Sequence, residues 1–287
     1  MTGSFGARLR VAMDQLGPLC AGIDPHPGLL AQWGLPHSVQ GLETFSMTCV
    51  EAFAGTVAVV KPQSAFFESF GSAGVAVLER TLTGLREAGT LSLLDVKRGD
   101  IGSTMAAYAH AYLSADSPLR ADAITVSPFL GFESLRPALD LARATGRGVF
   151  VLALTSNPEG AQVQQAMIDG RTVAGSIVDG VTSQNANDRS VGTLGSVGMV
   201  VGATVGEAVQ KLGLDLAAAN APLLAPGVGA QGATAGDLTK VFGPAVDNVL
   251  ASSSRNILQA GPDGASLRAA ARNTAQQLNV ILSASGQ

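Results

Sequence analysis

The sequence predicts an α/β protein of the (β/α)8 TIM-barrel class, folded as a single domain over residues 1–287. Short apolar runs recur along the chain with helical patterns between them. Several runs are apolar almost throughout, which is typical of strands buried on both faces of a parallel sheet. The length of 287 residues is ordinary for such a barrel, and 46% apolar with only 14% charged residues indicates that much of the chain lies in an interior or an interface.

Eight runs are expected to form the barrel strands: Leu19–Ile23, Val57–Val60, Leu91–Leu94, Ala123–Val126, Val149–Leu154, Gly198–Val201, Leu223–Ala225 and Val246–Ala251. Helical patterns are expected over Val75–Ala88, Thr104–Leu113 and, at the tail, Gly264–Leu282. The alternative is an open doubly wound sheet. Its dinucleotide-binding form would carry G-x-G-x-x-G after the first strand, and that motif is missing there.

The longest departure from this β/α rhythm is the segment 156–196, which follows the fifth strand. It is rich in Gly, Gln, Asn and Ser, and a helix is expected around Ala174–Asn187. A connection of this length in a compact barrel is often functional, so we expect a lid or an interface element over one mouth of the barrel.

Composition excludes several classes of partner. The net charge of −4 gives no reason to expect nucleic acid or an anionic membrane surface. No apolar stretch reaches the ~18 residues that a membrane span needs, and Met1–Arg10 lacks a signal-peptide core. Cys20 and Cys49 lie in apolar surroundings and are expected to be buried thiols. A cytoplasmic protein is the expectation.

Charged residues follow three consecutive strands. The first run is followed by Asp24, the second by Lys61, and the third by Asp95 and Lys97. A single charge at a strand end is more often a turn residue, but three strand ends in succession indicate a site. Because the strand ends converge in a barrel, these four side chains should meet in one pocket. The period of two places Lys97 on the same face as Asp95.

The three histidines carry less information. They lack the mutual spacing of a metal site and have no accompanying cysteine, so we expect structural or exposed roles for His26, His37 and His110. No metal site and no cofactor are predicted.

A second signal lies near the C-terminus, where Pro226 to Ala233 form a glycine-rich loop after the seventh strand. Such a loop exposes backbone N–H groups that suit a phosphate. Arg255 ends the eighth strand and can grip the same anion. Alone the loop reads equally well as a surface turn, but together they match the phosphate site common in these barrels.

These residues resemble the orotidine 5′-phosphate decarboxylase family, in particular its longer-chain bacterial subgroup (type 2). The family signature D-x-K-x-x-D-I-x-x-T stands here at 95–104. The first-strand Asp stands in Gly22-Ile23-Asp24-Pro25, the second-strand Lys in Val60-Lys61-Pro62, and the phosphate loop and arginine at 226–232 and Arg255. The landmarks run in family order from residue 22 to 256.

The resemblance implies conversion of orotidine 5′-phosphate to UMP and CO2 in pyrimidine biosynthesis, without a cofactor. Lys97 would protonate C6, and Asp95 would lie beside the substrate carboxylate. Asp100 would cross the interface of a homodimer into the partner's site, with Thr104 nearby. The remaining implied substrate contacts are Asp24 and Lys61 to the ribose, Ser156 to the pyrimidine, and Pro226, Gln231 and Arg255 around the phosphate.

Two alternatives remain open at the level of sequence. Related sugar-phosphate decarboxylases and aldolases share D-x-K-x-x-D but work on an enediolate with Mg²⁺, held by an acidic residue at the end of strand two. Lys61 occupies that position here and would repel the metal. A non-catalytic nucleotide-binding barrel is the other alternative, and it would be expected to have lost a member of the charge array.

Overall fold

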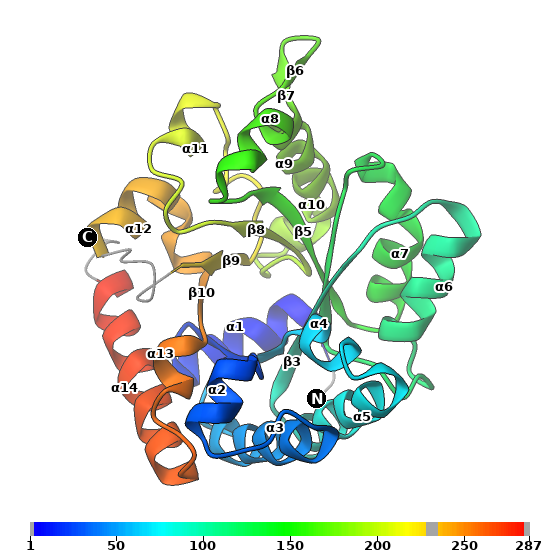
Figure 1. Cartoon of the computed structure of the whole chain (residues 1–287). Coiled ribbons are helices and arrows are strands. Elements are labelled where there is room, and N and C mark those ends of the chain that lie inside the picture. The colour runs from blue at the N-terminus through cyan, green and yellow to red at the C-terminus, as the bar shows by residue number, and fades with distance from the viewer. Residues whose placement is uncertain (1–2, 228–234, 284–287) are drawn as a thin grey trace.

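The computed structural model describes residues 3–227 and 235–283. Its centre is a closed barrel of parallel strands in the order β1-β10-β9-β8-β5-β4-β3-β2, which confirms the predicted fold class (Figure 1). The barrel strands are β1 Leu19–Ile23, β2 Val59–Pro62, β3 Leu91–Arg98, β4 Ala123–Val126, β5 Gly148–Leu154, β8 Val197–Val201, β9 Leu223–Pro226 and β10 Val249–Ser253. A separate antiparallel hairpin consists of β6 Met167–Ile168 and β7 Arg171–Thr172.

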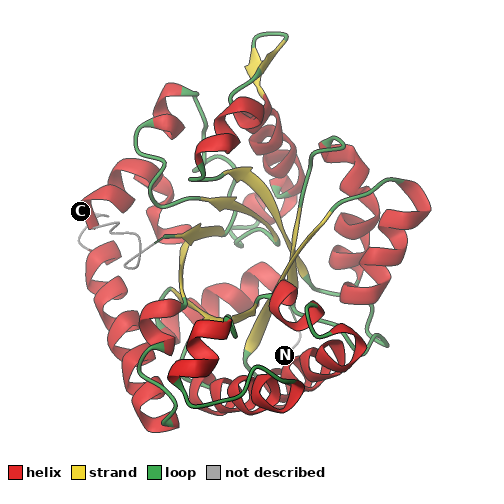
Figure 2. Cartoon of the chain, in the orientation of Figure 1, coloured by secondary structure: helices red, strands yellow, loops and turns green. Residues whose placement is uncertain are grey.

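Helices surround the barrel on its outer side (Figure 2). The α-helices are α1 Phe5–Leu16, α2 Pro27–Gln32, α3 Val39–Phe53, α4 Ser64–Glu68, α5 Gly71–Glu87, α6 Gly102–Leu113, α7 Arg136–Ala144, α8 Ala161–Gln164, α9 Val173–Gln184, α10 Ala186–Ser190, α11 Ala208–Lys211, α12 Ala235–Phe242, α13 Arg255–Leu258 and α14 Gly264–Ser283. Short 3-10 turns are η1 Phe132–Leu135, η2 Pro158–Gly160 and η3 Gly243–Asn248.

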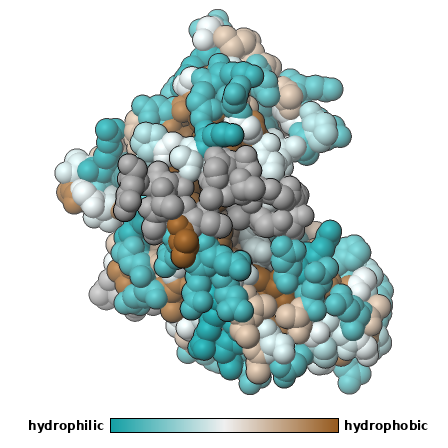
Figure 3. Space-filling model, turned by 90° about the vertical axis from the view of Figure 1, so that its left-hand side faces the viewer, coloured by the Kyte–Doolittle hydropathy of each residue, from teal (hydrophilic) through white to brown (hydrophobic). Residues whose placement is uncertain are grey.

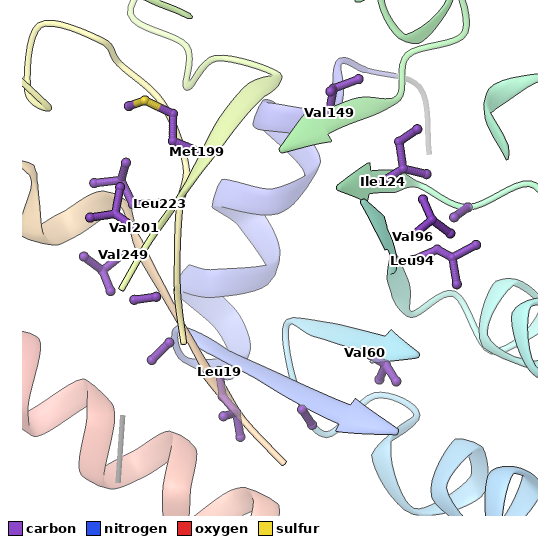
Figure 4. Close-up of a cluster of buried hydrophobic side chains, with 14 of the residues drawn as sticks. Leu19, Val60, Leu94, Val96, Ile124, Val149, Met199, Val201, Leu223 and Val249 are labelled. Atoms are coloured by element: carbon purple, nitrogen blue, oxygen red, sulfur yellow. The ribbon is translucent and has the colours of Figure 1, made fainter. Parts of the chain in front are cut away.

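Alternate residues of each strand enter two different cores, as the period of two requires. The outward set packs against the helices, and Figure 4 shows it at Leu19, Val60, Leu94, Val96, Ile124, Val149, Met199, Val201, Leu223 and Val249. The inward set fills the lower barrel and includes Cys20, Val59, Leu93, Ala123, Phe150, Val200, Leu224 and Leu250. The barrel is therefore solid below its C-terminal mouth.

Helix α1 closes the opposite end of the barrel and was not predicted from the sequence. Phe5, Leu9 and Met13 join the inward core, and the ring of Phe5 meets Phe150 edge-on at 5.9 Å. Glycine at position 148 leaves room for this pair, because a Cβ there would lie 2.3 Å from the Phe5 ring. The N-terminal helix thus closes the end of the barrel opposite its C-terminal mouth.

The predicted strands match the observed ones closely. Leu19–Ile23 and Ala123–Val126 have the predicted bounds. Strand β2 begins two residues later than predicted and includes Lys61, while Val246 belongs to η3 instead of β10. The predicted helices correspond to α5, α6, α9 and α14, each with bounds shifted by a few residues at most.

In the coloured parts of the face shown in Figure 3, hydrophilic residues predominate and apolar residues form smaller patches. None of the helices in the described ranges is long and apolar enough to cross a membrane.

Candidate active site

The inward face of the strands changes from apolar to polar at the C-terminal mouth. Two residues beyond the inward Val59, Leu93, Ala123 and Leu250 stand Lys61, Asp95, Thr125 and Ser252. These side chains lie at the floor of a cavity of about 740 Å³. Asp24 and Lys97 line the same cavity, so the predicted meeting of four charged residues is confirmed.

Asp95 is the centre of the charge array. Its Oδ2 accepts a hydrogen bond from Lys61 Nζ at 3.2 Å, and its Oδ1 accepts one from Lys97 Nζ at 2.6 Å. Thr125 Oγ1 also donates to Oδ1, at 2.8 Å. The side chains of Lys61 and Asp95 are only 7% and 8% exposed, whereas that of Lys97 is 47% exposed. One buried carboxylate therefore binds two ammonium groups, and Lys97 is the more exposed of the two lysines that line the cavity.

The backbone that presents Lys97 to the cavity is irregular. The pairing of β3 with β4 shifts register between Leu94 and Arg98, and Lys97 has φ of 44°. Left-handed backbone is costly for a residue with a side chain. The amide N–H groups of Val96 and Lys97 both donate to Thr125 Oγ1, at 3.1 and 2.9 Å, and hold the irregular segment in place. The predicted alternation nevertheless holds, because Asp95 and Lys97 both line the cavity while Val96 between them packs outward.

Gly99 continues this irregular backbone. A Cβ at this position would lie 2.4 Å from the carbonyl oxygen of Ser127, so only glycine allows the close approach. Ser127 N in turn donates to the Arg98 carbonyl at 2.8 Å. The loop after β3 is thereby fastened to the loop after β4.

Asp24 supplies a second carboxylate with unused hydrogen-bonding capacity. Its Oδ1 is buried and has no hydrogen-bond partner among the described residues. A buried acceptor without a donor costs free energy, which a bound ligand with a hydroxyl group can recover. Gly22 leaves space here, since a Cβ would lie 1.9 Å from Ser254 Oγ.

The charges of the array stabilise one another. Burial alone would raise the pKa of Asp95, but the Lys61 and Lys97 ammonium groups outweigh it and lower the pKa below its ordinary value. Burial alone would lower the pKa of Lys61, but the Asp24 and Asp95 carboxylates outweigh it and raise the pKa. Both groups therefore stay charged at neutral pH. Burial raises the pKa of the Cys20 thiol below them to about 12, so that thiol stays neutral.

These shifts predict how stability depends on pH. The lowered pKa of Asp95 contributes stability above its unfolded value of about 3.9, and this contribution is lost as pH falls through the folded pKa. The raised pKa of Lys61 contributes stability below its unfolded value of about 10.4, and this contribution is lost as pH rises through the folded pKa. We expect Lys61→Met to abolish the part of the stability loss at alkaline pH that comes from deprotonation of Lys61.

Urea unfolding of both proteins at a series of alkaline pH values measures this effect. The difference in unfolding free energy between wild type and Lys61→Met should shrink as pH rises. A difference that stays constant across the alkaline range would contradict the raised pKa.

The loop after strand β5 lines the cavity and is held in place by hydrogen bonds to the Gln164 side chain. Gln164 Oε1 accepts from Thr155 N at 2.8 Å, and Gln164 Nε2 donates to Thr155 Oγ1 at 2.7 Å. Thr155, Ser156, Asn157 and Gln164 all line the cavity. The segment 156–196 therefore divides into a part that borders the site, the β6–β7 hairpin with exposed Met167 and Ile168, and the barrel helix α9.

Strands β9 and β10 supply the other side of the mouth. Pro226, Gly227, Ser254 and Arg255 line the cavity, and the Arg255 side chain is exposed. Gln231, which was also predicted to contribute, lies outside the described residues. Pro226, Gly227 and Arg255 thus border one cavity as predicted, while residues 228–234 of the predicted loop lie outside the described residues.

Asp100 and Thr104 do not line the cavity of their own chain. The Asp100 carboxylate accepts a hydrogen bond from Ile101 N at 2.8 Å, and Thr104 is exposed in the first turn of α6. Apolar side chains are exposed nearby: Ile101 at 62%, Phe129 at 76% and Leu130 at 53%. The second half of the motif thus points away from the site that its first half builds.

Sequence reasoning missed several lining residues. Gln63 accepts from Lys61 Nζ at 3.0 Å, and Thr125 and Gln164 fix the backbone around the charged groups. Thr125 could have been found from the sequence, because it is a polar residue two positions beyond the inward Ala123 in the same strand. His26 was expected to be structural or exposed. It is exposed and caps α2 through Gly28 N, and it also lines the cavity.

Comparison with known proteins now identifies the family. The model of the "Orotidine 5′-phosphate decarboxylase / HUMPS family" matches residues 17–270. The chain belongs to this family. A Salinispora arenicola protein named orotidine 5′-phosphate decarboxylase is 64% identical over 269 residues, 93% of this chain and 94% of that protein. One of the same name from Streptomyces coelicolor is 57% identical over 283 residues, 98% and 99% of the two chains.

A solved structure agrees with these relatives. The Streptomyces avermitilis protein assigned as an orotidine 5′-phosphate decarboxylase has a TM-score of 0.93 against this chain and 56% sequence identity. The match covers 98% of this chain and 97% of that one. Family members share the barrel, so the mouth described above is the place to seek the reaction.

Proposed function

We propose that this chain, acting as one barrel domain over residues 1–287, converts orotidine 5′-phosphate to UMP and CO2. The observation that carries the proposal is the row of Lys61, Asp95 and Lys97 in an open cavity, in which the buried Asp95 carboxylate binds both ammonium groups. Relatives with the same enzyme name match nearly the whole chain. A cytoplasmic location is part of the proposal, and two free, buried thiols suit a reducing compartment.

The proposed chemistry places the reacting carbon against Lys97. Loss of CO2 from C6 leaves a carbanion without an adjacent π system to delocalise it. The Lys97 ammonium stabilises this charge and then donates a proton to C6. Its contact with Asp95 at 2.6 Å fixes it before the reaction, so it needs less reorientation than free water would.

The other charges orient the substrate in this proposal. Asp95 faces the carboxylate that leaves, while Asp24 and Lys61 contact the ribose hydroxyls. The unpartnered Oδ1 of Asp24 supports this role, because a ribose hydroxyl supplies the donor that it lacks. Ser156, on the loop tied by Gln164, contacts the pyrimidine.

Pro226, Gln231 and Arg255 bind the substrate phosphate in this proposal. We expect Arg255→Ala to weaken kcat/KM by about 2–4 kcal/mol, because a dianionic phosphate loses its bidentate partner. Steady-state kinetics on orotidine 5′-phosphate measures the effect. Arg268→Ala is a matched control, since Arg268 bonds the Glu51 carbonyl on the outer helices. An unchanged kcat/KM in Arg255→Ala would refute the phosphate assignment.

The Mg²⁺-dependent reaction on an enediolate is the alternative within this family of barrels. Lys61 lies at the end of strand two with its ammonium in the site, where an acidic metal ligand would be needed. Among the described residues, no three His, Cys, Asp or Glu side chains form a group that could hold a metal.

A spectrophotometric assay of orotidine 5′-phosphate loss tests the proposed function. We expect turnover by the purified protein without added metal and at the same rate in EDTA. Activity that EDTA abolishes and Mg²⁺ restores would favour the alternative. Absence of turnover under all conditions would contradict the proposal.

We also propose that the enzyme is a homodimer in which Asp100 enters the partner's site. The exposed Ile101, Phe129 and Leu130 support an interface beside Asp100, because their loops are fastened together at Arg98 and Ser127. Thr104, in the first turn of α6, is also exposed. Each site of the dimer would then use Asp95 and Lys97 from one chain and Asp100 from the other.

A further inference from the structure

Lys97 occupies a backbone conformation that its neighbours must enforce. A positive φ of 44° at a residue with a long side chain persists only where surrounding contacts over-determine it. Thr125 provides such contacts on the inner side, through the amides of Val96 and Lys97. The outer side needs an equivalent restraint, or the segment could relax toward regular strand geometry and move the ammonium.

Arg98 provides contacts on that outer side. Its Nη2 donates to Glu68 Oε1 at 2.6 Å, and its Nη1 lies 3.4 Å from the Val96 carbonyl oxygen. Its guanidinium also lies over the rings of Tyr108 and Tyr112, 5.6 and 6.0 Å from their centroids. One side chain thus binds the strand on which it sits, helix α4 and helix α6.

Glu68 links these contacts of Arg98 to strand β2. It ends α4, which begins two residues after β2, and its Oε1 also accepts from the buried Ser64 Oγ at 2.6 Å. Strand β2 carries Lys61 and β3 carries Lys97. The Arg98–Glu68 pair therefore spans the two strand ends whose lysines flank Asp95.

We propose that Arg98 and Glu68 are a positioning pair for Lys97. Neither residue lines the cavity, so they act through the backbone of the irregular segment and not on the substrate. The proposal rests on the proposed function, in which the Lys97 ammonium must meet C6. A reacting group displaced by about 1 Å can cost on the order of 100-fold in rate.

The test uses Arg98→Met, Glu68→Gln and the double variant, with wild type as reference. We expect Arg98→Met to lower kcat about 100-fold while UMP affinity stays close to wild type. The double variant should cost no more than Arg98→Met alone, because the two residues act as one unit. Arg80→Met is the matched control. Arg80 makes a comparable 2.6 Å contact with Glu43 between α5 and α3, and this variant should keep wild-type kcat.

A crystal structure of Arg98→Met supplies a readout that does not depend on activity. We expect Lys97 to leave positive φ, or its Nζ to lose the 2.6 Å contact with Asp95 Oδ1. Retention of both features together with wild-type kcat would overturn the positioning role. So would a fall in melting temperature with unchanged kcat, which marks a purely structural pair. Absence of turnover in the wild type would instead refute the proposed function, and the crystal structure would still decide the positioning role.

Discussion

Lys97→Ala is expected to abolish measurable turnover, with a loss of at least about 10⁴-fold in kcat. General-acid catalysis contributes ~10²–10⁴-fold, and a preorganised charge beside the carbanion contributes ~10²–10³-fold more. Alanine removes both effects. The remaining cavity, with Arg255 and the Asp24 carboxylate, keeps the groups proposed to bind phosphate and ribose. Nucleotide binding should therefore stay measurable by calorimetry with UMP.

A surface lysine provides the control for this variant. Lys211 pairs with Glu207 at 3.1 Å on an exposed helix, and Lys211→Ala should keep wild-type kinetics. If Lys97→Ala retained activity near wild type, another group would have to protonate C6. If it lost UMP binding as well as turnover, a structural role for Lys97 would explain the result better than a general-acid role.

Asp95→Asn is expected to impair both stability and catalysis. The carboxylate holds two ammonium groups and the Thr125 hydroxyl, and its side chain is 8% exposed. Neutralising it leaves the Lys61 charge buried without its closest anion. Breaking a buried pair in this way costs about 3–5 kcal/mol, which urea unfolding of the variant should reveal. The kcat should fall at the same time, because Lys97 loses the group that orients it.

Two further variants separate these effects. Asp122→Asn removes a carboxylate that pairs with Arg8 at 2.6 Å near the opposite end of the barrel, so it should lower stability but leave kcat unchanged. The double variant Lys61→Met/Asp95→Leu replaces the buried pair by apolar groups, so it should recover part of the stability and remain inactive. Stability equal to wild type in Asp95→Asn would contradict the central place given to Asp95.

The charged part of the site could be predicted because each charged residue is marked by the apolar run directly before it in the sequence. Asp24, Lys61, Asp95 and Lys97 each lie at or just beyond an apolar run, and a parallel barrel brings such ends together. Nothing beyond the strand pattern was needed to place them in one cavity.

The supporting contacts could not be predicted because they join residues that are distant in sequence or unremarkable in type. Thr125 and Asp95 lie 30 positions apart, as do Arg98 and Glu68. The register shift that gives Lys97 its positive φ depends on the neighbouring strand. Helix α1 had a usable signal in Ser4 as N-cap followed by apolar residues at positions 5, 9 and 13.

A crystal structure of the protein with UMP bound tests the assigned roles most directly. We expect pyrimidine C6 to face Lys97 Nζ, the phosphate to contact Arg255, and a ribose hydroxyl to donate to Asp24 Oδ1. We also expect Asp100 of a second chain to reach the same site. A nucleotide bound elsewhere, or bound with C6 turned away from Lys97 and Asp95, would contradict the proposed mechanism.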